Sequence, residues 1–322
     1  MEQPQITRAM LMDARKRVEE HAYHTPLLTS RLLSEQTGFN VRLKAEVFQR
    51  TGSFKIRGPL NKVATLSAEQ RRRGVVCSSA GNHAQGVALA AKLYGLRAVV
   101  VMAENATQSK IDATRGYGAE VVLHGHIWDE ANEKAIELAE QGGLTYIHPF
   151  DDVELIAGQG TLGMEIIDDF PEVDVIVVPI GGGGLIAGVA AAANVFKPSV
   201  RVIGVESSDG AAMKESLMKG SVMTLDAVNT IIDGLRVRRV GENSFAIVRD
   251  LVQSVVTVPD TDIFASMIWI MSHAKVVAEA AAASSVAAIQ AGLVDASPSE
   301  NVVCVLSGGN VDLGQLKGLR WN

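Results

Sequence analysis

Cysteine is scarce in this chain of 322 residues, which holds only Cys77 and Cys304. Both lie within apolar runs, which predicts two buried, reduced thiols and not a disulfide framework of the secreted kind. No apolar run reaches the roughly 18 residues of a membrane span, and the N-terminus is polar and charged, unlike a signal peptide. We therefore expect a cytoplasmic protein.

A strong charge of one sign is also missing, because the formal net charge of −6 is spread along the chain. This argues against binding to nucleic acid or to an anionic membrane. The seven histidines show no zinc-type spacing with cysteines or carboxylates, so we expect no metal site. A GxSxG motif, typical of serine hydrolases, is absent as well. Small molecules are the expected partners.

Short β-rich apolar runs alternate with longer segments of helical period. The runs lie at 74–79, 97–102, 119–125, 173–180, 200–206 and 301–307. The helical segments lie at 84–95, 104–117, 129–141, 184–195 and 262–293. Such alternation predicts an α/β protein with parallel sheets covered by helices. The length favours two domains or one large α/β unit.

Three of the predicted strands run directly into glycine-containing loops. These loops are SSAGNH (78–83), GGGG (181–184) and SGGN (307–310). In open α/β sheets, ligands bind outside the carboxyl ends of the strands. We therefore expect these three loops to form the binding site.

The loop Gly181, Gly182, Gly183 and Gly184 precedes a helical segment, so its backbone N–H groups and the helix dipole would suit a phosphate. A dinucleotide site is the rival interpretation. Gly182, Gly184 and Ala187 fit GxGxxG/A, and Glu206 follows at the spacing of a ribose-binding acid. The usual dinucleotide-binding unit opens its domain with this loop, whereas here a whole set of βα units precedes it, which argues against the rival interpretation. Both interpretations stay open at this point.

Lys55 stands between Phe54 and Ile56 in the stretch TGSFKIRG. A lysine is ordinarily a solvated surface group, but desolvation lowers the pKa of a lysine and frees its amine for Schiff-base chemistry. A phosphate loop, an apolar-flanked lysine and a polar turn are what a pyridoxal phosphate site requires. Asn82 fits either a helix cap or a ligand contact, and Ser307 fits either a plain turn or a ligand contact.

The motifs TGSFKIRG, SSAGNHAQGVA, GGGGLIAG and LSGGN, in this order, resemble the pyridoxal-phosphate enzymes of fold type II, and among them the serine/threonine dehydratase family. The resemblance covers nearly the whole chain. It implies a tryptophan synthase β-like fold with two open, mostly parallel twisted sheets covered by helices. It also implies a large cofactor-binding domain of residues 1–51 and 149–322, a small domain of residues 52–148, and no C-terminal regulatory domain.

Carried over to matching positions, the resemblance assigns each site residue a role. Lys55 would be the catalytic residue that holds pyridoxal 5′-phosphate as a Schiff base, and Phe54 would pack near the ring. The phosphate would be held by Gly181, Gly182, Gly183, Gly184 and Leu185; Asn82 would contact the 3′-oxygen and Ser307 the pyridine nitrogen. Ser79, Ala80, Gly81 and Asn82 would line the substrate site.

The activity implied is β-elimination from a small 3-hydroxy L-amino acid. L-Threonine would give 2-oxobutanoate and ammonia, and L-serine would give pyruvate as a secondary reaction. A homodimer or homotetramer is the implied assembly. A different class, a NAD(P)-dependent oxidoreductase, follows only from the dinucleotide interpretation.

Two alternatives stay within the family. Serine racemase uses a serine on the opposite face of the cofactor, where this chain has Ala80, so racemisation is not the expected main activity. A 3-hydroxyaspartate dehydratase would need a cation for the second carboxylate, and Arg57 or Arg115 is the candidate. Relatives that bind a divalent ion place an acid beyond the residue matching Glu206, where this chain has Gly210 and Ala212.

Overall fold

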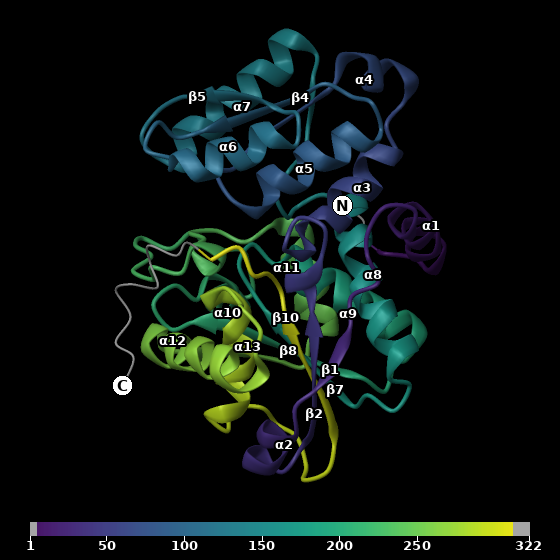
Figure 1. Ribbon diagram of the computed structural model, residues 1–322, viewed down its shortest axis with the longest axis vertical. Coiled ribbons are helices and arrows are strands. Elements are labelled where there is room, and N and C mark those ends of the chain that lie inside the picture. Colours follow the sequence, from purple (N-terminus) through teal and green to yellow (C-terminus); the bar gives the residue numbers. More distant parts are fainter. Residues whose placement is uncertain (1–4, 312–322) are drawn as a thin grey trace.

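The computed structural model describes residues 5–311 and distributes their strands over two sheets (Figure 1). The larger sheet has the strand order β1 (Leu27–Thr29), β2 (Asn40–Ala45), β10 (Asn301–Leu306), β7 (Val175–Pro179), β8 (Arg201–Ser207) and β9 (Ser254–Val258). The smaller sheet has the order β5 (Glu120–Leu123), β4 (Ala98–Met102), β3 (Val75–Ser78) and β6 (Thr145–Tyr146). Only the pairing of β1 with β2 is antiparallel among these ladders. The predicted α/β class with two mostly parallel sheets is confirmed.

Helices cover both sheets (Figure 1). They are α1 (Arg8–Glu19), α2 (Arg31–Thr37), α3 (Arg57–Ala64), α4 (Ala68–Arg73), α5 (Asn82–Leu93), α6 (Gln108–Gly116), α7 (Trp128–Gly142), α8 (Val153–Asp169), α9 (Gly184–Phe196), α10 (Ala212–Lys219), α11 (Glu242–Leu251), α12 (Asp260–Trp269) and α13 (Ala280–Gln290). Short helical turns lie at η1 (Glu46–Phe48), η2 (Phe54–Ile56), η3 (Asp233–Leu235) and η4 (Ile270–Ala274). Within residues 5–311, none of these helices is long and apolar enough to cross a membrane.

The prediction of one helical segment over 262–293 is wrong in its middle. Helix α12 passes into the π-helical turn η4, and Lys275 then takes a left-handed conformation with φ of 59°. A left-handed residue cannot continue a right-handed helix. The chain between Lys275 and α13 is therefore non-helical, and it delivers Glu279 to the end of β10, where the Glu279 N–H donates to the Gly308 carbonyl.

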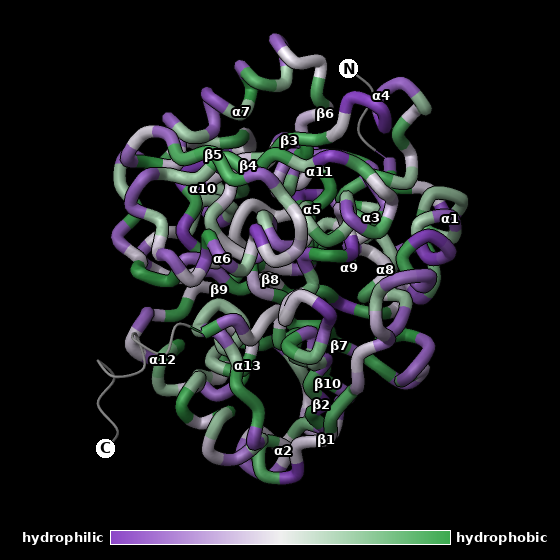
Figure 2. Tube along the Cα trace, turned by 45° about the horizontal axis from the view of Figure 1, so that its top comes forward, coloured by the Kyte–Doolittle hydropathy of each residue, from purple (hydrophilic) through white to green (hydrophobic). Residues whose placement is uncertain are grey.

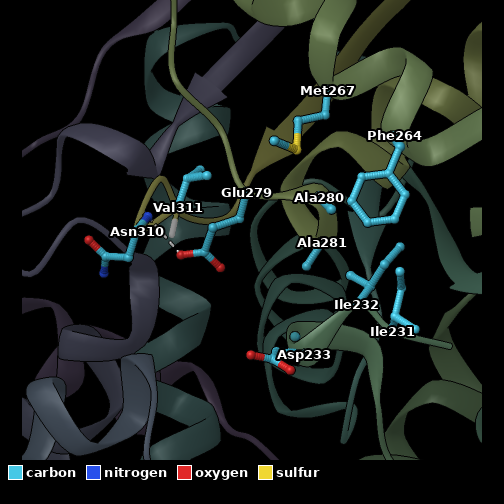
Figure 3. Close-up of a pocket in the computed structure, with 11 residues that line it drawn as sticks. Ile231, Ile232, Asp233, Phe264, Met267, Glu279, Ala280, Ala281, Asn310 and Val311 are labelled. Carbon is cyan, nitrogen blue, oxygen red and sulfur yellow. Dashed lines mark hydrogen bonds between the residues drawn. The ribbon is translucent and has the colours of Figure 1, made fainter. Parts of the chain in front are cut away.

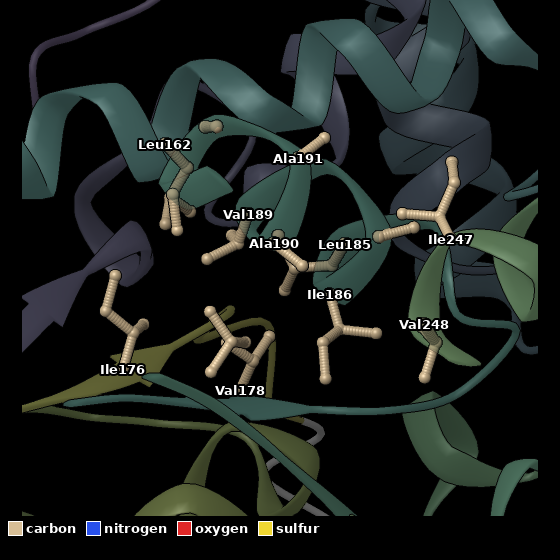
Figure 4. Packing of buried hydrophobic residues seen from close by; sticks show 14 of the residues in the cluster. Leu162, Ile176, Val178, Leu185, Ile186, Val189, Ala190, Ala191, Ile247 and Val248 are labelled. Carbon is tan, nitrogen blue, oxygen red and sulfur yellow. The ribbon is translucent and has the colours of Figure 1, made fainter. Parts of the chain in front are cut away.

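The apolar run of strand β7 is uninterrupted because the strand is buried on both faces. Its residues alternate between two cores, with Val175 and Val177 facing one and Ile176 and Val178 facing the other. Figure 4 shows Ile176 and Val178 packed beneath helix α9. A strand buried on both faces needs apolar side chains at every position, each contributing about 1.5–3 kcal/mol.

The hydrophobic residues follow the strands of the larger sheet, whereas hydrophilic residues gather on the outer helices (Figure 2). Cys77 and Cys304 lie inside, buried and unbonded, as predicted. Strands β7 and β10 are parallel neighbours, so the glycine loop 181–184 and the loop 307–310 emerge at the same edge of the larger sheet. The smaller sheet contributes the loop that follows β3.

Candidate active site

Lys55 lies in the turn η2, immediately before helix α3. Its Nζ donates a hydrogen bond to the Pro149 carbonyl oxygen at 2.9 Å. Burial lowers the pKa of Lys55 to about 8, although the Glu279 carboxylate opposes this shift. The Nζ atom also lies 5.3 Å from the centre of the Phe54 ring. An appreciable fraction of this amine is therefore uncharged and nucleophilic near neutral pH.

The backbone around Lys55 is tied to the end of strand β10. The Phe54 N–H donates to the Ser307 carbonyl at 3.0 Å, and Ser53 and Gly308 form an isolated antiparallel bridge. Ser307 is buried. Phe54 and Ser307, which are 253 positions apart in the sequence, thus meet next to Lys55.

The four glycines at 181–184 leave no room for side chains. A Cβ atom at Gly182 would lie 2.1 Å from Cγ of Phe150, and one at Gly181 would lie 2.4 Å from the Gly234 carbonyl oxygen. Gly183 has φ of +96°, which an L side chain rarely adopts. Helix α9 begins directly at Gly184, and Leu185 lies buried in its first turn. The loop therefore presents backbone N–H groups at a helix N-terminus, a geometry suited to an anion.

Asn82 is the first residue of α5, yet its side chain does not cap that helix. Its Nδ2 donates to both oxygens of Glu279, at 2.9 and 3.1 Å, and its Oδ1 accepts from Nδ2 of Asn310 at 2.8 Å. The Asn310 N–H also donates to Glu279 at 2.8 Å. These bonds join the loop of the smaller sheet to the end of β10 in the larger sheet, across the site.

Glu279 had no role in the prediction from sequence. Burial raises the pKa of its carboxyl group. The side chain borders a cavity of about 70 Å³ that Asp233, Asn310 and apolar residues such as Phe264 also line (Figure 3). The sequence signal was weak, because a single glutamate between alanines is also typical of a helix start.

The loop after β3 folds on itself before α5 begins. The Gly81 N–H donates to the Ser79 hydroxyl at 3.1 Å, and Ala80 packs against the apolar core of the smaller sheet. A substituent at Gly81 would meet nothing within 4 Å, so the space beside this loop is open. Ser79 to Asn82 thus frame an open position beside the N-terminus of α5, where N–H groups favour a carboxylate.

His83, also missed from the sequence, follows Asn82 and is buried. Its Nε2 lies 3.0 Å from the Ile147 carbonyl oxygen, and its Nδ1 has no partner among the described residues. Burial, with a further contribution from the Lys55 charge, lowers the pKa of His83 to about 3. The ring is therefore neutral, with Nε2 as the donor.

Arg57 does not have the freedom that a hydroxyaspartate site would require. It is fully buried, and its guanidinium group donates to Glu46 at 2.7 and 2.8 Å and to Glu165 at 2.6 and 2.8 Å. Its Nη1 also donates to the Thr161 hydroxyl at 3.2 Å, so all five N–H donors of this guanidinium group have partners and none is left for a substrate. Arg115 lies exposed in the last turn of α6.

Glu206, the acid of the dinucleotide interpretation, is buried and already has partners. Its carboxylate accepts the N–H groups of Met213 and Lys214 at 2.8 and 2.9 Å, at the start of helix α10. Burial raises its pKa to about 7. Both carboxylate oxygens thus serve the helix N-terminus, which removes the feature that favoured a ribose.

Residues 18–308 match the family model of the pyridoxal-phosphate dependent enzymes. The chain therefore belongs to this family, its fold is fold type II, and pyridoxal 5′-phosphate is its cofactor. The dinucleotide interpretation, and with it the oxidoreductase alternative, is wrong.

The chain is also similar to individual proteins of this family. An L-threonine ammonia-lyase from Thermotoga maritima is 45% identical over 311 residues, which cover 97% of this chain and 77% of the relative. The processed form of threonine deaminase isoform 2 from Solanum lycopersicum has a TM-score of 0.93 and 38% identity, with 98% of this chain and 89% of that chain covered. Maize serine racemase has a TM-score of 0.91 and 37% identity, with 96% and 95% covered.

Proposed function

We propose that this protein is an ammonia-lyase that converts L-threonine into 2-oxobutanoate and ammonia, and L-serine into pyruvate and ammonia more slowly. The observation that carries the proposal is the buried amine of Lys55, whose pKa is lowered to about 8 and which donates to the Pro149 carbonyl, next to the Phe150 that packs on the glycine loop. The similarity to the threonine ammonia-lyase from Thermotoga maritima supports the choice of substrate.

The residues present fit the cofactor. Lys55 would hold its aldehyde carbon, Phe54 would pack beside the ring, and Asn82 would contact the 3′-oxygen through an amide that now bonds to Glu279 and Asn310. When bound, pyridoxal phosphate supplies the electron sink that makes the substrate Cα proton acidic.

The remaining contacts concern the two ends of the cofactor and the substrate. The N–H groups at Gly181, Gly182, Gly183, Gly184 and Leu185 would bind the phosphate. Ser307 would face the pyridine nitrogen, and a neutral hydroxyl there does not require a protonated ring. The loop from Ser79 to Asn82 would bind the substrate carboxylate, because it borders an open position at a helix N-terminus.

The amine of Lys55 would take the Cα proton of the substrate as a general base. Its lowered pKa supports this role, because an amine with a pKa of about 8 is partly unprotonated at neutral pH. Loss of the β-hydroxyl as water, followed by addition of water and release of ammonia, balances the overall reaction. Only an amino acid with a hydroxyl group on Cβ can lose water in this way, so we propose a 3-hydroxy amino acid as the substrate.

Racemisation is the second candidate, since maize serine racemase is 37% identical to this chain. Ala80 argues against it as the main activity, because an alanine has no group that exchanges a proton on the second face. The 3-hydroxyaspartate alternative has lost Arg57 as its cation, because Glu46 and Glu165 occupy that guanidinium group.

One purification and one substrate panel test the proposal. Borohydride reduction of the yellow protein, followed by peptide mapping, should place the cofactor on Lys55, and a Lys55→Ala variant should not be labelled. Keto-acid release should be highest with L-threonine, lower with L-serine, and low with both 3-hydroxyaspartate diastereomers. A label on another lysine, or formation of D-serine faster than pyruvate, would contradict the proposal.

The division into a large domain (1–51 and 149–322) and a small domain (52–148), the homodimeric or homotetrameric state, and the cytoplasmic location also stay predictions. Light scattering of the purified protein tests the assembly. A mass equal to one chain of 34.2 kDa would contradict it.

A further inference from the structure

The segment from His148 to Asp152, which connects strand β6 to helix α8, lies against both the lysine and the glycine loop. Pro149 accepts the hydrogen bond from Lys55. Phe150 packs so closely on the glycine loop that a Cβ atom at Gly184 would lie 2.6 Å from the Phe150 carbonyl oxygen. We call residues 148–152 the connecting segment.

Asp151 of the connecting segment holds the start of helix α11. Its Oδ2 accepts the N–H of Glu242 at 2.9 Å, and its Oδ1 accepts the N–H groups of Asn243 and Ser244 at 2.9 and 3.2 Å. A carboxylate at a helix N-terminus is stabilised by these bonds and by the helix dipole. Asp151 thus serves as a cap for α11, although about 90 residues separate them in sequence.

The start of α11 is in turn the surface on which the glycine loop rests. The Gly241 N–H donates to the Gly182 carbonyl at 3.1 Å. A Cβ atom at Gly183 would lie 2.8 Å from Cβ of Ser244, whose hydroxyl donates to the Phe150 carbonyl at 3.1 Å. The position of Gly182 and Gly183 therefore depends on where α11 begins, and that depends on Asp151.

His148 orders the connecting segment itself. Its Nδ1 accepts the N–H groups of Phe150 and Asp151, at 3.2 and 2.8 Å. Burial lowers the pKa of His148 and so favours the neutral ring, and the two N–H donors assign Nδ1 as its acceptor nitrogen. The backbone of Asp151 is thus fixed by His148, and its carboxylate is bound by the N–H groups of α11.

We propose that Asp151 is a positioning residue for the phosphate-binding loop, acting through helix α11. It does not touch the reacting atoms, so it is not a catalytic residue. The proposal rests on the proposed function, in which the glycine loop binds the cofactor phosphate. A shift of the loop would weaken binding of the phosphate and leave the bond between Lys55 and the aldehyde carbon intact.

The test compares how tightly the apoprotein binds pyridoxal phosphate and pyridoxal, which lacks the phosphate. The variant is Asp151→Asn, because the amide keeps the size but removes the negative charge and replaces one of the two acceptor oxygens with an NH2 donor that faces an N–H group of α11. The matched control is Asp152→Asn. Asp152 is also a capping aspartate, with its Oδ1 accepting the Leu155 N–H at 2.9 Å, but it serves α8.

In Asp151→Asn, an N–H group of α11 loses its acceptor, so the affinity for pyridoxal phosphate should fall about tenfold, a change of about 1.4 kcal/mol, while the affinity for pyridoxal stays within about twofold. The preference for the phosphate form should therefore fall about tenfold. In Asp152→Asn the preference should match that of the wild type, even if the melting temperature of the apoprotein falls.

The results distinguish failure of the positioning role from failure of the proposed phosphate site. An unchanged preference in Asp151→Asn, or an equal loss for both ligands, would overturn the positioning role and leave the phosphate loop standing. A wild-type protein that binds both ligands equally would instead refute phosphate binding by the glycine loop. Asp151→Ala, measured in parallel, should show the same loss of preference as Asp151→Asn, and an unaltered preference there would also overturn the role.

Discussion

Replacing Arg57 with methionine should destabilise the protein strongly, because Arg57 is the centre of a buried charge network. The network contains two cations, Lys44 and Arg57, and two carboxylates, Glu46 and Glu165, all buried. In Arg57→Met, Glu165 would keep Lys44 as a partner at 2.6 Å. Among the side chains of residues 5–311, Glu46 would keep only the Thr25 hydroxyl as a hydrogen-bond partner, at 2.5 Å.

The magnitude follows from the charge left behind. Breaking a buried pair by removing one partner costs about 3–5 kcal/mol, because the remaining charge stays desolvated. Arg57→Met should therefore lower the free energy of unfolding of the apoprotein by about that amount, measured by urea denaturation. Neutralising the stranded carboxylate in the double variant Arg57→Met/Glu46→Gln should recover at least about 1 kcal/mol.

The matched control is Arg97→Met. Arg97 also makes two hydrogen bonds to one glutamate, Glu120, at 2.8 and 2.7 Å, but both side chains are more than half exposed. An exposed pair contributes about 0–1 kcal/mol. If Arg57→Met cost no more than Arg97→Met, or if the double variant were no more stable than Arg57→Met alone, the reasoning would be refuted.

Three further predictions concern the site. Gly182→Ala should lower the free energy of unfolding by about 1–3 kcal/mol and weaken cofactor binding, because its Cβ atom would overlap Phe150. In the control Gly116→Ala, the new Cβ atom meets nothing within 4 Å, so this variant should be as stable as the wild type or more stable. Equal melting temperatures for the two variants would contradict this prediction. The rate at which the apoprotein binds pyridoxal phosphate should rise with pH, with a midpoint at about 8, because only the unprotonated amine of Lys55 reacts. Stopped-flow absorbance measurements over a pH series check this midpoint. A rate that does not change between about pH 6.5 and 9.5 would contradict the lowered pKa of Lys55. His83 has a pKa of about 3 in the folded state and a usual value of 6.5, so between these pH values the unfolded chain binds a proton that the folded chain does not. The free energy of unfolding should therefore fall as pH decreases from 6.5 toward 3, by up to about 1.4 kcal/mol per pH unit. His83→Gln should show a shallower fall in urea denaturation, and an identical slope would argue against a neutral buried ring.

The predicted strands are present with their ends shifted by no more than two residues. Strands such as β7 were readable because burial on both faces demands an unbroken apolar run, which is a local property of the sequence. The helical segment 262–293 was overpredicted, because the apolar period continues through η4 and does not register the left-handed residue Lys275. Nothing local to a lysine marks that conformation.

The α/β class and the three strand-end loops could be predicted from the sequence alone, because they depend on short motifs and on periodicity, and the role of Lys55 stays a prediction. Only the tertiary structure decided which side chains meet: Glu279 with Asn82, Arg57 with Glu46 and Glu165, and Asp151 with the start of α11. Each of these contacts except Arg57 with Glu46 is made between residues about 90 or more positions apart. The sequence offers several possible partners for each charged or amide side chain and does not select one. Burial then selects among them, because a buried polar group must find its partners within the fold.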